Sequence, residues 1–223
     1  LVHFGFRLLY NEIAWTYYVV SLLVSLGDWR AWQLAARPFI QGADVLEIGH
    51  GPGHMLLALR RAGYRVIGLD LSPYMGRLAQ RRLRNAGAPV ARAVPLVRAD
   101  VMAMPFGTAV FDTVLATFPT DYVIDPATLA NVNRVLRGNG RFVIVPEGHL
   151  TGIGPVSRFI EWLYTITGQR TGPFAVDETG DWPDHPVWQM MNEQFTAAGF
   201  RLEREQIQLR RSAVTILIVW KQS

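Results

Sequence analysis

The chain has 223 residues, and half of them are hydrophobic, which is enough to bury one sizeable core. Its 22 basic and 18 acidic residues leave a net charge of +4, a mild excess that selects none of nucleic acid, a membrane surface or an anionic substrate. The absence of cysteine excludes disulfides and thiolate metal sites and favours an intracellular protein.

The first segment of the chain is predicted to form a helical lid. Residues 6–36 carry two helical patterns that break near Gly27–Asp28, so we assign residues 1–40 to the lid and 41–223 to the main domain. No secretion signal opens the sequence, and we expect a cytoplasmic protein. The most apolar run, Ile13 to Leu26, is shorter than the roughly 20 residues that span a bilayer, and it predicts a buried or interfacial helix compatible with peripheral membrane contact.

Short apolar runs alternate with amphipathic stretches in the next part of the chain. Strands are expected at Val45–Ile48, Val66–Leu69, Val94–Ala99, Phe111–Ala116 and Phe142–Val145, and helices from about Gly53, at Pro73–Asn85 and at Pro126–Leu136. This alternation predicts βαβ units, in which a parallel sheet carries helices on both faces. The fold class is therefore α/β, with a doubly wound sheet.

The regular pattern breaks at residues 151–186, which we interpret as an insertion after the fifth strand. A helix is expected at about Val187–Ala198, followed by two apolar runs, Phe200–Leu209 and Ala213–Trp220. Because only a short polar link separates these runs, they predict an antiparallel hairpin. The hairpin brings the mostly parallel sheet to seven strands.

The most informative segment is a glycine loop, residues 49–53, that follows the first predicted strand. Gly49, Gly51 and Gly53 suit a tight turn that lets a ligand approach the backbone, and the next helix offers its N–H groups to that ligand. A dinucleotide fingerprint would need a sixth-position glycine, where His54 stands. Glu47 instead gives the spacing E-x-G-x-G-x-G. A purely structural turn is the alternative interpretation.

Two further acids end the following strands. Asp70 closes the second predicted strand, where a carboxylate can accept hydrogen bonds from two ribose hydroxyls; Ser72 suits the N-cap of the next helix, which leaves Asp70 available. Asp100 closes the third strand, where it can accept from an exocyclic amine while the N–H of Val101 donates to a ring nitrogen, and loop capping is its alternative role. The carboxyl ends of parallel strands meet at one crevice, so these acids are expected to face the same ligand.

Residues 40–146 resemble the Rossmann-like methyltransferases of the type 11 superfamily. The resemblance rests on V-L-E-I-G-H-G-P-G (45–53), G-L-D-L-S-P-Y-M (68–75), R-A-D-V-M-A-M-P-F (98–106), F-D-T-V-L-A-T-F (111–118) and R-V-L-R-G-N-G-R-F-V-I-V (134–145). It implies S-adenosyl-L-methionine as cofactor and S-adenosyl-L-homocysteine as product, with the glycine loop at the methionine moiety, Asp70 at the ribose, and Asp100 with Val101 at adenine. The remaining expected cofactor contacts are Glu47, His50, Leu71, Thr117 and Phe118.

The N-terminal segment is similar to the opening of the ubiquinone/menaquinone C-methyltransferases. Tyr17, Ser25, Gly27 and Trp32 match that opening, whereas Tyr18 stands where those proteins have an aspartate. The resemblance implies that the segment caps the cofactor and that Tyr17 contacts its methionine end. An aromatic side chain packed within a lid helix is the alternative.

Methyl transfer requires an acceptor held in line with the S–CH₃ bond, so proximity, orientation and exclusion of water can supply most of the rate. If a base takes part, His149 is the first candidate, followed by Asp121 and Tyr122; the alternative, which the sequence favours for each, is a loop residue without a catalytic role. Thr117 is expected near the methyl end, and Phe118 against the cofactor or the acceptor. The five scattered histidines predict no metal site.

The acceptor is predicted to be a small lipophilic or aromatic molecule, quinone-like or lipid-like, rather than nucleic acid. The apolar lid and a group of tryptophans, Trp162, Trp182 and Trp188, suit an apolar pocket, although the same residues suit a core. Two other functions stay open: a cofactor-binding interaction module without catalysis, and a nicotinamide-dependent oxidoreductase. The oxidoreductase is disfavoured because Lys221 is the only lysine, so a Ser/Tyr–Lys catalytic pair is missing.

Overall fold

The structure is a computed structural model that describes residues 29–146, 148–150, 186–210 and 212–222. The predicted lid is described only from Trp29 onward, so Tyr17 lies outside the described residues. Nearly all of the predicted insertion at residues 151–186, with Trp162 and Trp182, also lies outside them.

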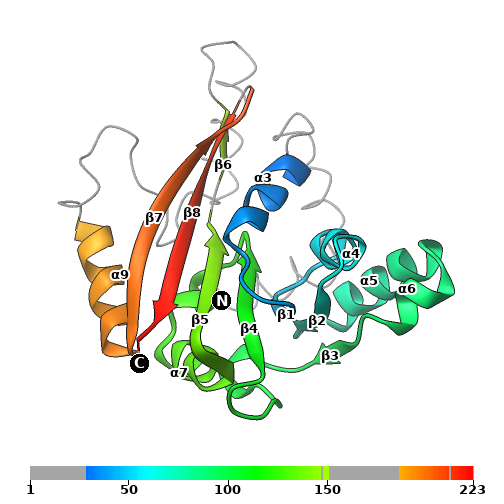
Figure 1. Cartoon of the computed structure of the whole chain (residues 1–223), viewed down its shortest axis with the longest axis horizontal. Coiled ribbons are helices and arrows are strands. Elements are labelled where there is room, and N and C mark those ends of the chain that lie inside the picture. Colours follow the sequence, from blue (N-terminus) through cyan, green and yellow to red (C-terminus); the bar gives the residue numbers. More distant parts are fainter. Residues whose placement is uncertain (1–28, 147, 151–185, 211, 223) are drawn as a thin grey trace, which may run out of the picture.

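One mixed sheet forms the centre of the molecule (Figure 1). Its strands are β1 Asp44–Ile48, β2 Arg65–Asp70, β3 Leu96–Arg98, β4 Phe111–Thr117, β5 Leu136–Val145, β6 Gly148–Leu150, β7 Phe200–Gln208 and β8 Ser212–Lys221. The order is β3-β2-β1-β4-β5-β8, with β6 and β7 both paired to β8. The first five strands are parallel, and β8 is antiparallel to its neighbours. This arrangement confirms the predicted α/β class with an antiparallel C-terminal hairpin.

The sheet has one more strand than the sequence predicted, and the extra strand continues an existing one. β5 pairs with β8 up to Ile144 opposite Leu217, and β6 resumes the pairing at Gly148 opposite Val214, shifted by one residue. Pro146, which has no N–H to donate to a ladder, stands in the gap. β5 and β6 therefore form one interrupted line beside β8, so the seven-stranded plan holds.

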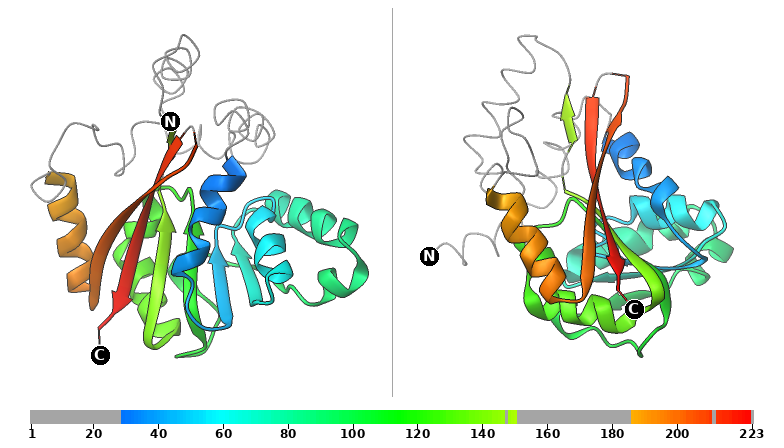
Figure 2. Two further views of the ribbon diagram at one scale, coloured as in Figure 1. Left: turned by 45° about the horizontal axis from the view of Figure 1, so that its top comes forward. Right: turned by 60° about the vertical axis from the view of Figure 1, so that its left-hand side comes forward.

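Helices cover both faces of the sheet (Figure 2). They are α3 Trp29–Ala35, α4 His54–Arg61, α5 Pro73–Asn85, α6 Ala88–Arg92, α7 Pro126–Val135 and α9 Pro186–Ala197, with short turns η1 Arg37–Phe39, η2 Val101–Ala103 and η3 Asp121–Ile124. α5 and α7 each begin with a proline at N1 behind a capping side chain, Ser72 or Asp125, which explains why their starts were predicted correctly.

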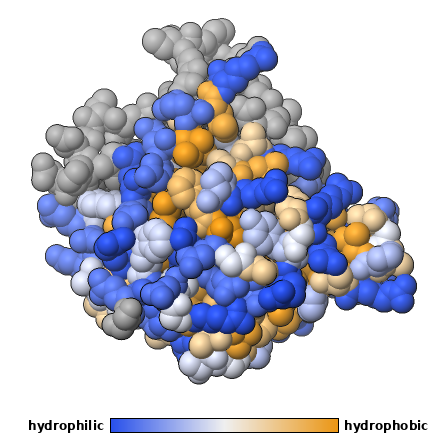
Figure 3. Space-filling view, in the orientation of Figure 1, coloured by the Kyte–Doolittle hydropathy of each residue, from blue (hydrophilic) through white to orange (hydrophobic). Residues whose placement is uncertain are grey.

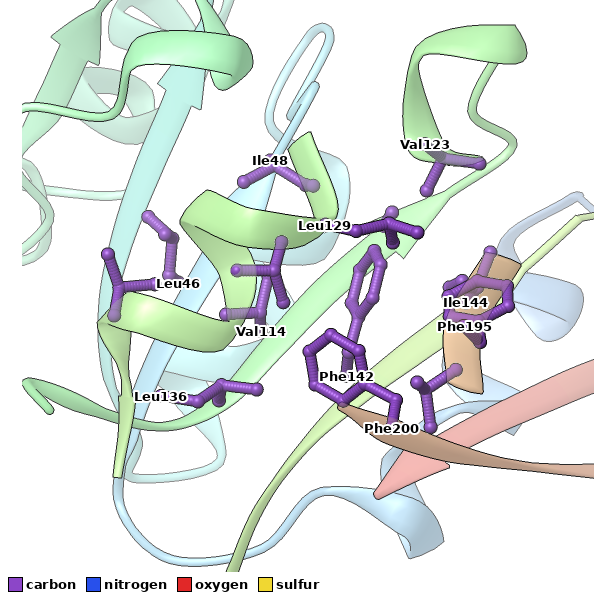
Figure 4. Close-up of a cluster of buried hydrophobic side chains, with 14 of the residues drawn as sticks. Leu46, Ile48, Val114, Val123, Leu129, Leu136, Phe142, Ile144, Phe195 and Phe200 are labelled. Atoms are coloured by element: carbon purple, nitrogen blue, oxygen red, sulfur yellow. The ribbon is translucent and has the colours of Figure 1, made fainter. Parts of the chain in front are cut away.

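The side chains of β1 alternate between two buried clusters. Leu46 and Ile48 face a cluster completed by side chains of α7 and α9, including Leu129 and Phe195 (Figure 4). Val45 faces the opposite cluster, which includes side chains of α3 and α4. Glu47 follows the same alternation as Val45, so it points toward the α4 side of the sheet.

Three predicted boundaries or elements differ from the structure. β3 covers only Leu96–Arg98, shorter than the predicted Val94–Ala99, and Ala88–Arg92 before it forms the unpredicted short helix α6. β5 starts at Leu136, earlier than the predicted Phe142, and runs through the glycine-rich Gly138–Gly140 that resembles a turn.

Within the described ranges, no helix is long and apolar enough to cross a bilayer.

Candidate functional site

The glycine loop joins the end of β1 to the start of α4 in a left-handed backbone. The φ angles of Gly49, Gly51 and Gly53 are 63°, 51° and 75°, a region that strains residues with a Cβ. Three hydrogen bonds fasten the loop to β2. The N–H groups of Gly49 and His50 donate to the Leu69 carbonyl at 2.7 Å and 3.4 Å, and the N–H of Gly51 donates to Asp70 Oδ2 at 2.9 Å. The ends of β1 and β2 are thereby held together.

The three glycines have different surroundings. A Cβ on Gly49 would collide with the hydroxyl of Tyr122 from η3, and a Cβ on Gly53 would lie 2.9 Å from the Cβ of Ala79 in α5. A Cβ on Gly51 would have no atom within 4 Å. Of the three, Gly51 is thus the position with open space beside it, while Gly49 and Gly53 accommodate other parts of the chain.

Asp70 accepts hydrogen bonds within the protein that the sequence did not suggest. Ser72 does cap α5, accepting from the N–H of Met75 at 3.3 Å. Asp70 nevertheless accepts from the N–H of Ser72 at 2.8 Å through Oδ1, in addition to its Oδ2 bond to Gly51. Asp70 therefore has a structural role that the sequence did not indicate, because it orients the loop. Each carboxylate oxygen keeps a second acceptor site, so ribose hydroxyls remain compatible with it.

Asp100 lies at the adjacent strand end. Asp70 pairs with Arg98 in the sheet, and Asp100 follows two residues later. Its Oδ1 caps η2 by accepting from the N–H of Met102 at 2.9 Å, which is the loop-capping role that the sequence left open. The carboxyl group is exposed, so its other oxygen is accessible to a ligand.

Exposed apolar side chains flank both acids. Four large hydrophobic side chains are exposed among the described residues, and two of them are Leu71 at 61% and Met102 at 40%. Leu71 directly follows Asp70, and Met102 lies two residues after Asp100. Apolar surface beside hydrogen-bonding carboxylates is the combination that a flat heteroaromatic ring requires. Leu71 was among the predicted contacts, whereas Met102 was not singled out.

Glu47 and two histidines form the buried polar part of the site. Glu47 is fully buried, and neither carboxyl oxygen makes a hydrogen bond. Burial raises the pKa of Glu47 well above its usual range, and the charge of Asp70 raises it further. His50 is 4% exposed and donates from Nδ1 to the Gly51 carbonyl at 2.7 Å, while burial lowers its pKa. Burial and nearby arginines lower the pKa of His54 to about 4.

The end of β4 contributes Thr117 and Phe118. Glu47 pairs with Leu115, so Thr117 lies level with Gly49 on the next strand. Phe118 has φ 52°, a conformation that is rare for a bulky residue and that concentrates at functional sites. The ring of Phe118 stacks on that of Trp29 from α3, with centroids 3.9 Å apart.

Helix α3 is docked against this end of the sheet by specific contacts. Gln33 donates from Nε2 to Thr117 Oγ1 at 3.2 Å, and Trp32 donates from Nε1 to Ser212 Oγ at 2.9 Å. A Cβ on Gly148 would collide with the Trp32 ring, so this glycine makes room for the indole. Sequence reasoning did not single out Trp29 or Gln33 as site residues; the only available signal was their place in an aromatic-rich amphipathic segment.

The three candidate bases occupy different surroundings. Tyr122 places its hydroxyl against Gly49 of the glycine loop. Asp121 lies on the same turn, η3, and is exposed. His149 belongs to β6, where its backbone is paired with Ala213. In the part of the chain that the structure describes, no group of His, Asp and Glu side chains could hold a metal ion.

Comparison with known proteins gives consistent matches. Residues 46–144 match a family model described as a methyltransferase domain, type 11. A demethylmenaquinone methyltransferase of Thermobifida fusca is 32% identical over 181 residues, covering 79% of this chain and 73% of the relative. A demethylmenaquinone methyltransferase of Mycobacterium bovis is 32% identical over 205 residues, covering 86% of this chain and 82% of the relative.

A solved structure shares the fold. It is an S-adenosylmethionine-dependent methyltransferase of Thermotoga maritima, with a TM-score of 0.62, 17% identity, and coverage of 93% of this chain and 95% of that one. At this level of identity the likeness concerns the architecture alone.

Proposed function

Because the chain belongs to the type 11 family of S-adenosylmethionine-dependent methyltransferases, we propose that it methylates a small lipophilic or aromatic acceptor, quinone-like or lipid-like. The observation that carries this proposal is the likeness to demethylmenaquinone methyltransferases, 32% identical across 73% and 82% of their lengths. The stacked pair Trp29–Phe118 at the end of β4 supports an acceptor with a flat ring.

The residues present fit the cofactor that this family uses. The open space at Gly51 allows a ligand to lie against the backbone, and Asp70 has acceptor sites for ribose hydroxyls. Leu71 and Met102 offer apolar surface for adenine, with the carboxylate of Asp100 at its edge. Glu47 is a buried acid without a partner, which suits the ammonium group of a methionine moiety. These assignments are our proposal for the cofactor site.

Methyl transfer requires the protein mainly to position the acceptor against the cofactor and to exclude water from the site. The cofactor supplies a methyl group on a sulfonium centre, which an acceptor can attack without metal assistance. Thr117 is held by Gln33, and Phe118 is held by Trp29, so the end of β4 offers a preorganised wall for the acceptor. Helix α3 covers this wall and would shield it from water, which strengthens polar interactions within the site.

Of the three candidate bases, we propose Tyr122 as the one that acts in the reaction. Its hydroxyl can both donate and accept a hydrogen bond, and it lies against the glycine loop, so it could orient a hydroxyl acceptor or pass on its proton. Asp121 is exposed and would need to turn toward the crevice. A contribution from His149 remains a proposal based on its place after the fifth strand.

The direct test is transfer of a labelled methyl group. The protein is incubated with labelled S-adenosylmethionine and, in separate reactions, a demethylated quinone, a set of small phenols and a total lipid extract. Label in the quinone or the lipid fraction supports the proposal, and label only in polar acceptors contradicts it. Tight cofactor binding without transfer to any fraction would favour the inactive interaction module.

Peripheral contact with a membrane is a separate part of the proposal and is tested separately. Figure 3 shows apolar residues interspersed with hydrophilic ones on the face that it draws. The full chain is sedimented with vesicles of neutral and of anionic lipid. Recovery in either pellet supports membrane contact, and recovery in neither contradicts it.

A further inference from the structure

Glu47 occupies a position in β1 where an acid has little support. Its strand neighbours are Gly68 in β2, which has no side chain, and Leu115 in β4, which is fully buried. Glu47 itself has no exposed surface, and neither oxygen has a hydrogen-bond partner of normal geometry; the N–H of Leu56 is the one donor near enough to favour its ionised form. A charged carboxylate is strongly disfavoured in such surroundings unless a cation or several donors compensate it.

The neighbouring elements supply no such compensation. Asp70 on β2 is negative and acts against ionisation of Glu47, while only the N–H of Leu56 in α4 favours it. His50 in the glycine loop and His54 in α4 both have lowered pKa values and are neutral at near-neutral pH. Arg82 of α5 donates to the Pro52 carbonyl, Arg30 of α3 acts on His54, and Tyr122 of η3 contacts Gly49. None of the cations within the described ranges forms an ion pair with Glu47.

We propose that Glu47 is protonated in the cofactor-free protein and releases this proton when the ammonium-bearing end of S-adenosylmethionine binds beside the glycine loop. This inference rests on the proposed cofactor site. On binding, the O–H bond of the carboxyl group breaks, its electron pair stays on the oxygen, and the proton passes to solvent. Binding would thus convert a neutral buried acid into the counter-charge of the ligand.

The physical reason is that an opposite charge favours the ionised form of an acid, whereas burial favours the neutral form. In the empty protein burial and Asp70 act together, and both raise the pKa of Glu47. A bound cation reverses the balance, and the low local dielectric that made ionisation costly also makes the attraction strong. A ligand without the cationic group would gain nothing from Glu47, so the residue would also select for the cofactor.

Isothermal titration calorimetry measures this proton directly. S-adenosylmethionine is titrated into the full chain at several values from mildly acidic to neutral pH, each in two buffers with different heats of ionisation. The dependence of the binding heat on buffer gives the number of protons released per ligand. We expect a release approaching one proton at the acidic end, declining as the pH rises above the pKa of Glu47 in the empty protein.

Two variants test whether the released proton comes from Glu47. Glu47→Gln keeps the size of the side chain and should bind with a heat that no longer depends on buffer. Glu203→Gln makes the same change on β7, where the oxygen accepts from Trp220 Nε1 at 2.9 Å, and should release the proton as the native chain does. Proton release that persists in Glu47→Gln would overturn the inference.

The outcomes separate the inference from the proposed function. A native chain that binds no S-adenosylmethionine contradicts the cofactor site itself. A native chain that binds it with the same heat in both buffers at every pH contradicts only the proton release. If Glu47→Gln fails to fold, infrared difference spectroscopy on the native chain replaces it: a protonated carboxyl band that disappears when the cofactor binds supports the inference, and its absence overturns it.

Discussion

The hydroxyl of Tyr122 lies where a side chain on Gly49 would begin. Because Tyr122 comes from η3, after β4, and Gly49 directly follows β1, this contact joins the ends of these two neighbouring strands. Gly49 is therefore required by the protein's own tyrosine, and Gly51 is the position with open space beside it. The two glycines should respond differently to the same substitution.

Gly49→Ala is expected to destabilise the protein and weaken cofactor binding. An alanine at φ 63° costs about 1–2 kcal/mol in strain, and its Cβ displaces the Tyr122 hydroxyl in addition. Urea unfolding measures the stability, and calorimetry measures the affinity for S-adenosylmethionine. An unchanged unfolding free energy would show that Tyr122 does not occupy this position.

Gly51→Ala provides the matched comparison. Its φ of 51° carries a similar strain, but the added methyl meets no atom within 4 Å. We expect a loss of stability smaller than that of Gly49→Ala, together with a loss of cofactor affinity of at least tenfold, about 1.4 kcal/mol. Native affinity in Gly51→Ala would place the cofactor away from the loop.

Asp70→Ala should weaken S-adenosylmethionine binding by about 1–3 kcal/mol, the scale of lost hydrogen bonds to a charged group. The substitution removes the proposed ribose contact and also the acceptor for the Gly51 and Ser72 N–H groups. Calorimetry gives the affinity. Ser72→Ala, which removes the cap of α5 but leaves the Asp70 carboxylate, should bind the cofactor as the native chain does. Equal losses in both variants would assign the effect to the helix start.

Phe118→Leu should impair methyl transfer more than cofactor binding. The change removes the stack with Trp29, and an aromatic pair contributes about 0.5–1.5 kcal/mol, which corresponds to a few-fold to tenfold loss in kcat/KM for an aromatic acceptor. Phe195→Leu, in the pair with Phe200 on α9 and β7, is the control and should reduce stability without this selective effect. A loss of cofactor affinity with unchanged transfer would contradict an acceptor-side role.

Glu47→Gln should change how stability depends on pH. The pKa of Glu47 is raised above the reference value of 4.5, so the folded state holds the proton more tightly than the unfolded chain. Native stability from Glu47 is therefore full below the unfolded pKa and declines as pH rises toward the folded pKa. The buried His50 acts oppositely below about pH 6.5, so the native chain is compared with the variant at each pH.

Urea unfolding between about pH 5 and about pH 8 measures this difference in stability. The advantage of the native chain over Glu47→Gln should shrink as the pH rises. A difference that stays constant over the whole range would mean that Glu47 is ionised in the folded protein as it is in the unfolded chain, contrary to its burial.

The elements with strong periodicity and clear caps were predictable. Pro73–Asn85 forms α5 as expected, because Ser72 and Pro73 mark its start and the apolar positions recur at helical spacing. The early start of β5 was not predictable, since Gly138–Gly140 resembles a turn. Leu136 pairs with Phe111 of β4, and the register then shifts before Arg141 pairs with Thr113. β6 was missed because three residues after a proline carry no period of their own.

The position of the site was also predictable, while its internal contacts were not. The ends of β1 and β2 meet because parallel strands run in one direction, which brings Asp70 to the glycine loop. That Tyr122 faces Gly49, Ala79 faces Gly53 and Trp29 stacks on Phe118 depends on tertiary packing between distant segments. No local pattern in the sequence encodes those partners.

A crystal structure of the full chain grown with S-adenosylhomocysteine tests the central claim most directly. We predict the nucleoside at the carboxyl ends of β1, β2 and β3, with the ribose on Asp70, adenine between Leu71 and Met102, and the amino-acid end beside Gly51. Density for the ligand elsewhere on the molecule, or an empty crevice at saturating ligand, would contradict the account.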